Sequence, residues 1–435
     1  MIFFSIIIAA ALFALGRVVI GRIAPLESNP WLYKALTVCL VLHLLGAPVQ
    51  IWVVDHLYGG IADYNRYDAQ GAILAEGFRH FNFSLAPAGL MGIVSDGSVS
   101  IVAGVVFAII GVNQLGAFLV FSWLSFIGIV FFYRAYITTF GGAGSRRYGY
   151  LLFFLPTLIF WTSDVSKESI MTFLMGLIAY GCARILAHRG GYWMVIAGSA
   201  GGVFIRPNEV LLALGGFTLA MLFRPADPNT KFAGPRRTVA LIVLGSMLGV
   251  AIFVTLHFLP GTSGSISLTE ISKNNNSAVG TAGFGSSNLG YSPSVLAYPK
   301  DVYSVMFDPL PINAHGGGQW ITAVENTVLV VVILKSLRQL RMLPRVALAR
   351  TYVFMSLFFT GSFLYAFASL GNLGLITRER TVMLPFFLVL VCIPLGPRHG
   401  RPRYEWELPR RARIERRKAL ALRPSAGRPR RAAPP

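Results

Sequence analysis

Long apolar runs constrain the fold of this chain more than any other feature of its sequence. They include Trp31–Val54, Leu115–Tyr133 and Val239–Leu259, and a helix needs roughly 20 residues to cross a hydrocarbon core. Hydrophobic residues make up 54% of the 435 positions and charged residues only 13%, against about 25% charged in soluble domains. We therefore expect an all-α polytopic membrane protein, with the lipid bilayer as its first partner.

The net charge of +20 would suit a nucleic-acid-binding protein if it lay on one soluble surface. Instead, residues 398–435 hold 13 Lys and Arg against three Glu, which is half of the excess. Most of the remainder lies in short stretches between apolar runs. Membrane topology and anionic lipids explain this distribution, so no nucleic-acid partner is expected. The basic tail is a candidate to bind anionic lipids or an acidic protein.

Basic clusters between the apolar runs predict the side of the membrane on which each loop lies. The positive-inside rule assigns these clusters to the cytoplasm, and the chain must leave and return between any two neighbouring clusters. They lie at residues 17–34, 134–147, 184–189, 224–237 and 335–350, and in the tail.

This count predicts about eleven spans in a bacterial plasma membrane, with the N-terminus outside and the C-terminus in the cytoplasm. Residues 1–397 are the expected transmembrane domain, with outer loops at 55–112 and 260–318, and residues 398–435 a disordered cytoplasmic tail. The first 16 residues are an uncleaved span, because arginines follow the apolar stretch instead of preceding it. Ile101–Ile110 is too short to cross, so we expect it to lie along the membrane surface or to dip into the membrane.

The outer loop at 55–112 contains the polar stretch "GGIADYNRYDAQG" (59–71). Asp63 and Tyr67 are four residues apart and share a helix face, where an aspartate beside an aromatic wall can act as a general base. Alternatively, Asp63 caps a helix from about 64 to 79 and Tyr67 anchors at the interface. Asp68 and Arg66 could form a solvated pair.

Three further polar stretches are expected on the same outer side, as turns or breaks between spans. In "WTSDVSKES" (161–169), Asp164 or Ser163 could cap the next helix, or Lys167 could contact a phosphate while the acids help to bind a metal. In "FIRPNE" (204–209), Arg206 interrupts an apolar run, which suggests an anion site at a broken helix or a pair with Glu209. In "LITRER" (375–380), Arg378 and Arg380 suit phosphate recognition.

Metal and nucleotide sites have no supporting motif. Asp308 and His315 are too few for a metal site, and the three cysteines fall inside apolar runs without a metal-binding spacing. A divalent metal therefore lacks support, and no cofactor is predicted.

The order of these stretches resembles the GT-C superfamily of polytopic glycosyltransferases. An outer loop with Asp-x-x-x-Tyr (Asp63 to Tyr67) is followed by "AQGAILAEGF", a surface stretch over residues 84–111 ending near "GVNQLGAFL", and a span that closes on Arg134. The likeness covers residues 33–225 in layout. The chain departs from the family by an extra N-terminal span and by Asp63-Tyr64 where the family has paired acids, so a second acid would come from Asp68 or Asp164 or be absent.

The resemblance implies transfer of a sugar from a polyprenyl-phosphate carrier to an envelope glycan or glycolipid on the outer face. Asp63 would be the catalytic residue that deprotonates or orients the acceptor hydroxyl, and Tyr67 and Trp161 would offer apolar faces to a sugar ring beside Asp68 and Asp164. The phosphate would bind to Arg206, Arg378, Arg380 and Lys167. Three alternatives remain open: a polysaccharide polymerase or ligase, a transporter or flippase, and a non-catalytic scaffold for envelope assembly.

Overall fold

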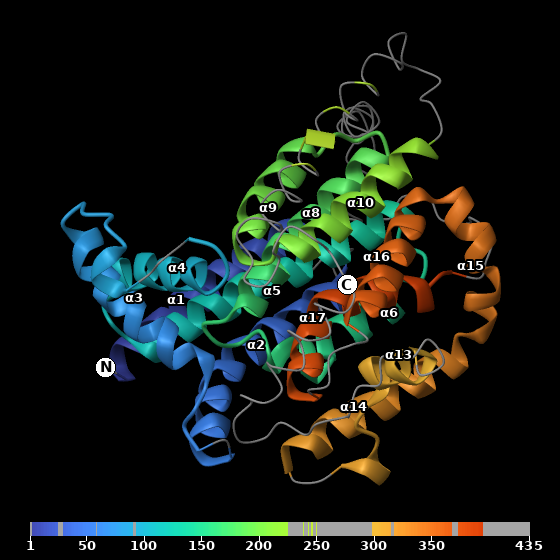
Figure 1. The fold of residues 1–435 in the computed structure, drawn as a ribbon. Coiled ribbons are helices and arrows are strands. Elements are labelled where there is room, and N and C mark those ends of the chain that lie inside the picture. Colours follow the sequence, from blue (N-terminus) through green and yellow to red (C-terminus); the bar gives the residue numbers. More distant parts are fainter. Residues whose placement is uncertain are drawn as a thin grey trace, which may run out of the picture.

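A computed structural model describes most of the chain outside residues 225–297 and 395–435. The described residues are 2–24, 29–57, 59–89, 93–224, 298–314, 317–367 and 373–394, with single positions at 238, 242, 245, 246 and 249. Their regular structure is entirely helical (Figure 1). The predicted all-α fold is therefore confirmed for these residues, while the basic tail and most of the expected loop 260–318 lie outside them.

The described helices fall into two groups in the sequence, one before residue 225 and one after residue 297. The first group is α1 (Ile2–Ile23), α2 (Pro30–Leu57), α3 (Asp63–Arg79), η1 (Ala86–Ala88), α4 (Asp96–Ile110), α5 (Gln114–Phe140), α6 (Ser145–Phe154), α7 (Pro156–Phe160), α8 (Lys167–Leu186), α9 (Tyr192–Ile205) and α10 (Pro207–Leu222). The second group is α13 (Tyr298–Phe307), η2 (Pro311–Asn313), α14 (Gly317–Lys335), α15 (Leu337–Ala349), α16 (Thr351–Phe367) and α17 (Leu373–Val391).

Several helices are suited to crossing a membrane. Within the described residues, α1, α2, α5 and α8 are long and apolar enough, and the bent pair α15–α16 would make a fifth span. The helices α4, α9 and α10 are apolar but shorter. These features fit a polytopic membrane protein, and the count of about eleven spans stays a prediction.

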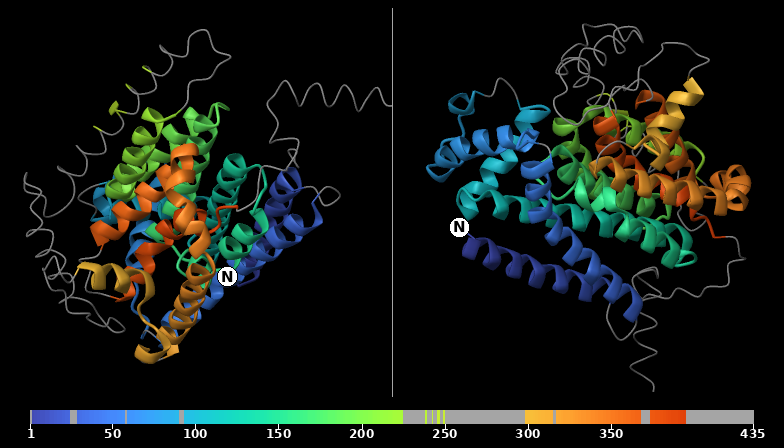
Figure 2. Two further views of the ribbon diagram at one scale, coloured as in Figure 1. Left: turned by 90° about the vertical axis from the view of Figure 1, so that its right-hand side faces the viewer. Right: turned by 90° about the horizontal axis from the view of Figure 1, so that it is seen from below.

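The core is built on the contact between α5 and α8, which lie side by side in the centre of Figure 1. Glycine lets their backbones touch: a Cβ on Gly128 would lie 2.3 Å from the carbonyl oxygen of Thr172, and one on Gly176 would lie 2.4 Å from that of Gly128. Small residues permit such close approach between membrane helices. The other face of α8 packs on α9, α10 contacts α16, and α1 lies at the edge against α2 and α5 (Figure 2).

The first predicted outer loop folds into a helix pair, α3 and α4, at one edge of the molecule (Figure 1). The predicted helix over 64–79 is confirmed, since α3 spans Asp63–Arg79. Ile101–Ile110 forms the larger part of α4, which packs along α3. The start of α4 is tied to the end of α9, because the backbone nitrogen of Ser95 donates to the carbonyl oxygen of Phe204 at 2.6 Å.

One of the predicted turns differs in the structure. The break at "FIRPNE" is confirmed, since α9 ends at Ile205 and α10 begins at Pro207. The prediction of a turn at "LITRER" is wrong, because these residues belong to α17, whose first residue is Leu373. The apolar segment before "WTSDVSKES" is not one continuous helix, because it breaks between α6 and α7. Pro156 has no backbone N–H and disfavours helical conformation at Leu155.

Three arginines of the predicted cytoplasmic clusters each contact a residue that belongs to another of these clusters. Arg350 donates to the carbonyl oxygen of Thr139 near the end of α5, and Arg224, just after α10, contacts His188, just after α8. Arg147 at the start of α6 bonds to Ser336 between α14 and α15. These contacts join residues of the clusters at 134–147, 184–189, 224–237 and 335–350, and the side of the membrane on which they lie stays a prediction.

The glycine contact between α5 and α8 gives a direct stability test. Gly176→Ala should lower the stability by about 3 kcal/mol and the melting temperature by roughly 5 °C, because two backbones must move apart. Gly361→Ala is the matched control: it lies within α16, has no atom within 4 Å of the new Cβ, and should be neutral or stabilising. Thermal unfolding in detergent measures both, and equal melting temperatures would contradict the contact.

Candidate functional site

Arg206 occupies the break between α9 and α10 and is nearly buried, with 8% of its side chain exposed. The helix stops there because Pro207 has no N–H to donate and suits the first position of a new helix. The guanidinium contacts the carboxylates of Glu168, Glu209 and Glu379, with 2.8 Å from Nη1 to Oε1 of Glu209. The pair with Glu209 that the sequence offered as an alternative is present, and two more acids join it.

Arg378 extends this set of ion pairs from α17 to α3. Its Nε lies 2.9 Å from Oε1 of Glu168, and its Nη1 lies 2.6 Å from Oδ2 of Asp63. Asp63 does not cap α3, as the alternative for that residue required: the N-cap is Ala62, and no side chain bonds to the free amides there. Asp63 is instead the first helical residue, and 54% of its side chain is exposed.

Asp96 at the start of α4 holds a second set of contacts. Lys167 Nζ lies 2.6 Å from Oδ1 of Asp96, the Tyr67 hydroxyl donates to the same oxygen at 2.8 Å, and Arg66 pairs with Oδ2. Burial by itself would raise the pKa of Asp96, but the attraction of Lys167 and these hydrogen bonds lower it to about 2. The predicted solvated pair of Arg66 with Asp68 is therefore wrong, because Asp96 takes Arg66 instead.

We refer to Asp63, Asp96, Lys167, Glu168, Arg206, Glu209, Arg378 and Glu379 as the charged cluster. Four of its acids lie in the first turns of helices: Asp63 in α3, Asp96 in α4, Glu168 in α8 and Glu209 in α10. Helix N-termini carry partial positive charge and stabilise anions. The convergence of four such ends explains how the cluster holds more carboxylates than cations.

Asp164 and Asp68 lie beside the cluster and form no ion pair with a described residue. Asp164 accepts a hydrogen bond from Nε2 of Gln50 at 3.4 Å. Burial raises the pKa of Asp164 to about 7, and burial with the nearby charge of Asp164 raises that of Asp68 to about 7. The predicted cap of α8 by Asp164 or Ser163 is wrong, since Ser166 caps it and forms a capping box with Ser169.

Arg380 and Trp161 have other surroundings. Arg380 is fully buried, donates to the carbonyl oxygen of Met306 at 3.1 Å and faces Glu325 at 3.6 Å. Residues two apart on a helix point to nearly opposite sides, so α17 separates Arg380 from Arg378. The ring of Trp161 packs edge-on against Phe160, and no described contact joins it to the charged cluster. The structure thus does not group these two residues with the other predicted site residues.

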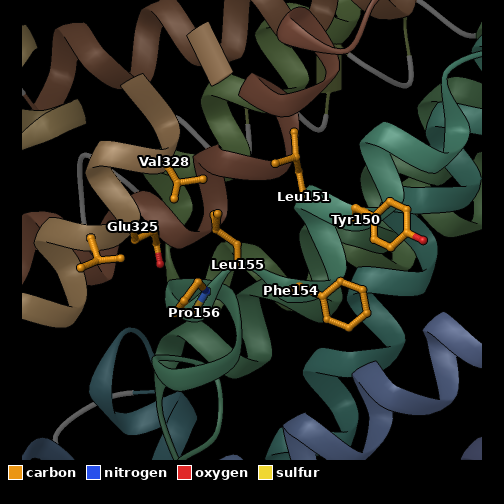
Figure 3. A pocket seen from close by; sticks show the side chains of 8 residues that line it. Tyr150, Leu151, Phe154, Leu155, Pro156, Glu325 and Val328 are labelled. Carbon is orange, nitrogen blue, oxygen red and sulfur yellow. The ribbon is translucent and has the colours of Figure 1, made fainter. Parts of the chain in front are cut away.

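An apolar cavity of about 550 Å³ lies on the Arg380 side of α17, between α6, α7 and α14 (Figure 3). Glu325 is its charged member, and Oε2 of this buried carboxylate accepts from the backbone nitrogen of Thr157 at 2.6 Å. Exposed apolar side chains, including Tyr150 and Val328, stand at its rim. The lining residues are Tyr150, Leu151, Phe154, Leu155, Pro156, Val324, Glu325 and Val328.

Sequence reasoning found part of the charged cluster, including Asp63 and the Glu209 partner of Arg206, but did not name Asp96, Glu168 or Glu379 as site residues. Asp63, Lys167, Arg206 and Arg378 were predicted. The structure joins Asp63, Arg378 and Arg206 through Glu168, adds Glu209 and Glu379 on Arg206, and pairs Lys167 separately with Asp96. The available signal was the closeness in sequence of each predicted cation to an acid, since Glu168, Glu209 and Glu379 lie within three residues of Lys167, Arg206 and Arg378. Asp96 lies instead at the start of a helix. Among the described residues, no group of three or more His, Cys, Asp and Glu could hold a metal ion.

The chain has no significant match to a protein-family model, a curated protein or a solved structure. Its function must therefore be inferred from the cluster, the cavity and the membrane-suited helices.

The raised pKa of Asp164 predicts a stability change between about pH 4 and pH 7. In that window the folded protein keeps a proton that the unfolded chain has lost, so stability falls as pH rises and levels off above pH 7. Asp164→Asn should reduce this decline, leaving the part due to Asp68, whose pKa is also raised to about 7, and should raise stability at pH 8 by about 2 kcal/mol. Thermal unfolding from pH 4 to pH 8 measures it.

Asp96→Asn is the contrasting control for this pH profile. Because the pKa of Asp96 is lowered to about 2, its contribution is complete above about pH 4 and is lost only as pH falls toward 2. The slope between pH 4 and pH 8 should therefore survive in Asp96→Asn. An unchanged slope in Asp164→Asn would contradict the assignment to Asp164.

Proposed function

We propose that this protein is a polytopic membrane glycosyltransferase of GT-C type that uses a polyprenyl-phosphate-linked sugar. The observation that carries the proposal is the contact of Asp63 on α3 with Arg378 on α17, 2.6 Å apart and partly exposed at the edge of the charged cluster. A carboxylate and a guanidinium at one water-accessible point supply a base and an anion-binding group.

In this proposal, about eleven spans place the charged cluster on the outer face of a bacterial plasma membrane. The positive-inside rule supports that orientation, because the basic residues meet at other helix ends. The N-terminus is then outside and the C-terminus cytoplasmic. Residues 84–111, which include η1 and α4, take the place of the juxtamembrane segment of the GT-C family.

The acid-rich cluster means that a substrate phosphate must displace a carboxylate to reach an arginine. Among the ion pairs of Arg206 and Arg378, Asp63–Arg378 is the most exposed, with 54% of Asp63 and 21% of Arg378 accessible, whereas Glu168 and Glu209 are fully buried. A lipid-linked phosphate would replace Asp63 on Arg378. Asp63 is then free to accept a proton, so donor binding and activation of the base are coupled.

The transfer step follows from these roles. The acceptor hydroxyl gives its proton to Asp63 while its oxygen bonds to the anomeric carbon of the sugar. The bond between that carbon and the phosphate oxygen breaks, and the electron pair leaves on the polyprenyl phosphate. Arg378, supported by Arg206 and Lys167, stabilises the additional negative charge. The acceptor is an envelope glycan or glycolipid, and Tyr67, which bonds to Asp96, lies one helical turn from Asp63.

The cavity between α6, α7 and α14 suits a segment of the isoprenoid chain. Its lining is almost entirely apolar, and α17 carries both Arg378 on the cluster side and Arg380 behind Glu325. A chain bound there would run beside the helix that holds the phosphate-binding arginine.

Asp63→Asn should reduce sugar transfer by about 100-fold or more, because the amide cannot take the acceptor proton. Glu76→Gln is the matched control on the same helix: Glu76 is 73% exposed and pairs only with Arg79 and His80 among the described residues, so activity should stay unchanged. Transfer from a radiolabelled lipid-linked sugar in proteoliposomes measures both variants. Full activity of a well-folded Asp63→Asn protein would refute the role of Asp63.

Val328→Trp should raise the KM for the lipid donor about ten-fold or more and leave kcat nearly unchanged, because the indole fills the cavity without touching the charged cluster. Val331→Trp is the matched control, since Val331 is exposed on the same helix and does not line the cavity. The same proteoliposome assay with varied donor gives both constants. An unchanged KM in Val328→Trp would exclude this cavity from donor binding.

The alternative functions give different results in strains and liposomes. A polymerase or ligase would leave undecorated lipid-linked repeat units in a deletion strain, whereas loss of one sugar branch fits the proposed transferase. A transporter would move substrate across liposomes without forming a glycosidic bond, and transporters place their polar sites near the membrane midplane. A scaffold would keep its cellular role in Asp63→Asn.

A further inference from the structure

The helix α15 (Leu337–Ala349) has an unusual position between two other helices. It connects α14 to α16 and is bent by 119° relative to α16, a geometry that fits either a broken span or a re-entrant pair of helices. Its sequence, "LRQLRMLPRVALA", contains three arginines and no acid. It lies at the helix ends where the basic clusters meet, since Ser336 before it bonds to Arg147 and Arg350 after it bonds to Thr139.

The three arginines of α15 form one ridge. At about 100° per residue, Arg338, Arg341 and Arg345 fall within a sector of about 60°, and all three are exposed. The buried residues of the helix, Gln339 and Ala347, lie on the side away from this ridge. The ridge therefore points away from the protein.

An exposed apolar flank runs beside the arginine ridge. Leu337 is 49% exposed and Leu348 is 74% exposed, and Pro344 on the same flank is also exposed. By the same helical spacing, this flank lies roughly 75° around the helix from the centre of the ridge. Adjacent basic and apolar faces are the pattern of helices that lie in a membrane interface.

The ridge has no counter-charge in the part of the chain that the structure describes. Arg338, Arg341 and Arg345 form no ion pair with a described residue. Like charges three and four residues apart destabilise a helix. An external anionic surface would relieve that repulsion, and each arginine near such a surface strengthens binding.

We propose that α15 lies in the membrane interface and that Arg338, Arg341 and Arg345 bind the phosphate headgroups of acidic phospholipids. The exposed leucines beside the ridge favour a lipid surface over an acidic protein, because they can enter the acyl-chain boundary next to the headgroups. This site requires a membrane but not the proposed transferase activity.

The test measures hydrogen exchange of amides 337–349 in the full-length protein, held in neutral detergent and titrated with phosphatidylglycerol or phosphatidylcholine. Phosphatidylglycerol should slow exchange of these amides at low salt, and phosphatidylcholine should not. Arg338→Gln/Arg341→Gln/Arg345→Gln should raise the lipid concentration for half-protection by about 100-fold, which is about five-fold for each arginine.

Two further variants separate charge from misfolding and α15 from the tail. The triple Arg→Lys variant keeps the charge and should stay within about five-fold of the wild type. Arg410→Gln/Arg411→Gln/Arg413→Gln removes three arginines from the tail and should leave the protection of α15 unchanged.

Four results would overturn the proposal. They are equal protection by phosphatidylcholine, an unchanged response of the triple Gln variant, equal protection by inorganic phosphate alone, and protection by polyglutamate without protection by phosphatidylglycerol. Inorganic phosphate would identify a free-anion site, and polyglutamate would identify an acidic protein partner.

Discussion

A single buried carboxylate, that of Glu168, connects the parts of this protein that form its charged cluster. Oε1 of Glu168 accepts from Nη2 of Arg206 and from Nε of Arg378, so it joins the start of α8 to the helix break and to α17. Arg378 then reaches Asp63 on α3. The proposed base is therefore positioned by a residue more than a hundred positions away in the sequence.

These ion pairs depend on one another because few of their members face water. Removing one partner of a buried pair leaves an uncompensated charge, at a cost of about 3–5 kcal/mol. Arg206 and Glu168 are nearly or fully buried, whereas Asp63 is half exposed. The cluster thus combines an interior that must stay paired with an edge where a partner can be exchanged. This difference in exposure is the reason that the proposal places the incoming anion at Arg378. The four helix N-termini beside the cluster also favour negative charge there.

Local patterns predicted the helices well where the signal was strong. The helix after Asp63, the long apolar helices and the break at Arg206 follow from periodicity, hydropathy and a proline. Prediction failed where a charged stretch was taken for a turn: "LITRER" is helical, and its arginines face opposite sides of α17. Charge alone does not distinguish a turn from a helix whose charges are buried against partners. The acids Asp96 and Glu379 were missed because their cations are distant in sequence.

The sequence by itself determined that this chain is helical, membrane-suited and asymmetric in charge, because hydropathy and residue spacing are local properties. It also marked Asp63, Lys167, Arg206 and Arg378 as unusual, since polar residues are costly beside long apolar runs. Only the tertiary structure decided which charges pair, that Arg380 faces Glu325, and that Asp63 meets Arg378 instead of capping α3. Those outcomes depend on how α3, α8, α10 and α17 pack, and no local pattern encodes contacts between residues hundreds of positions apart.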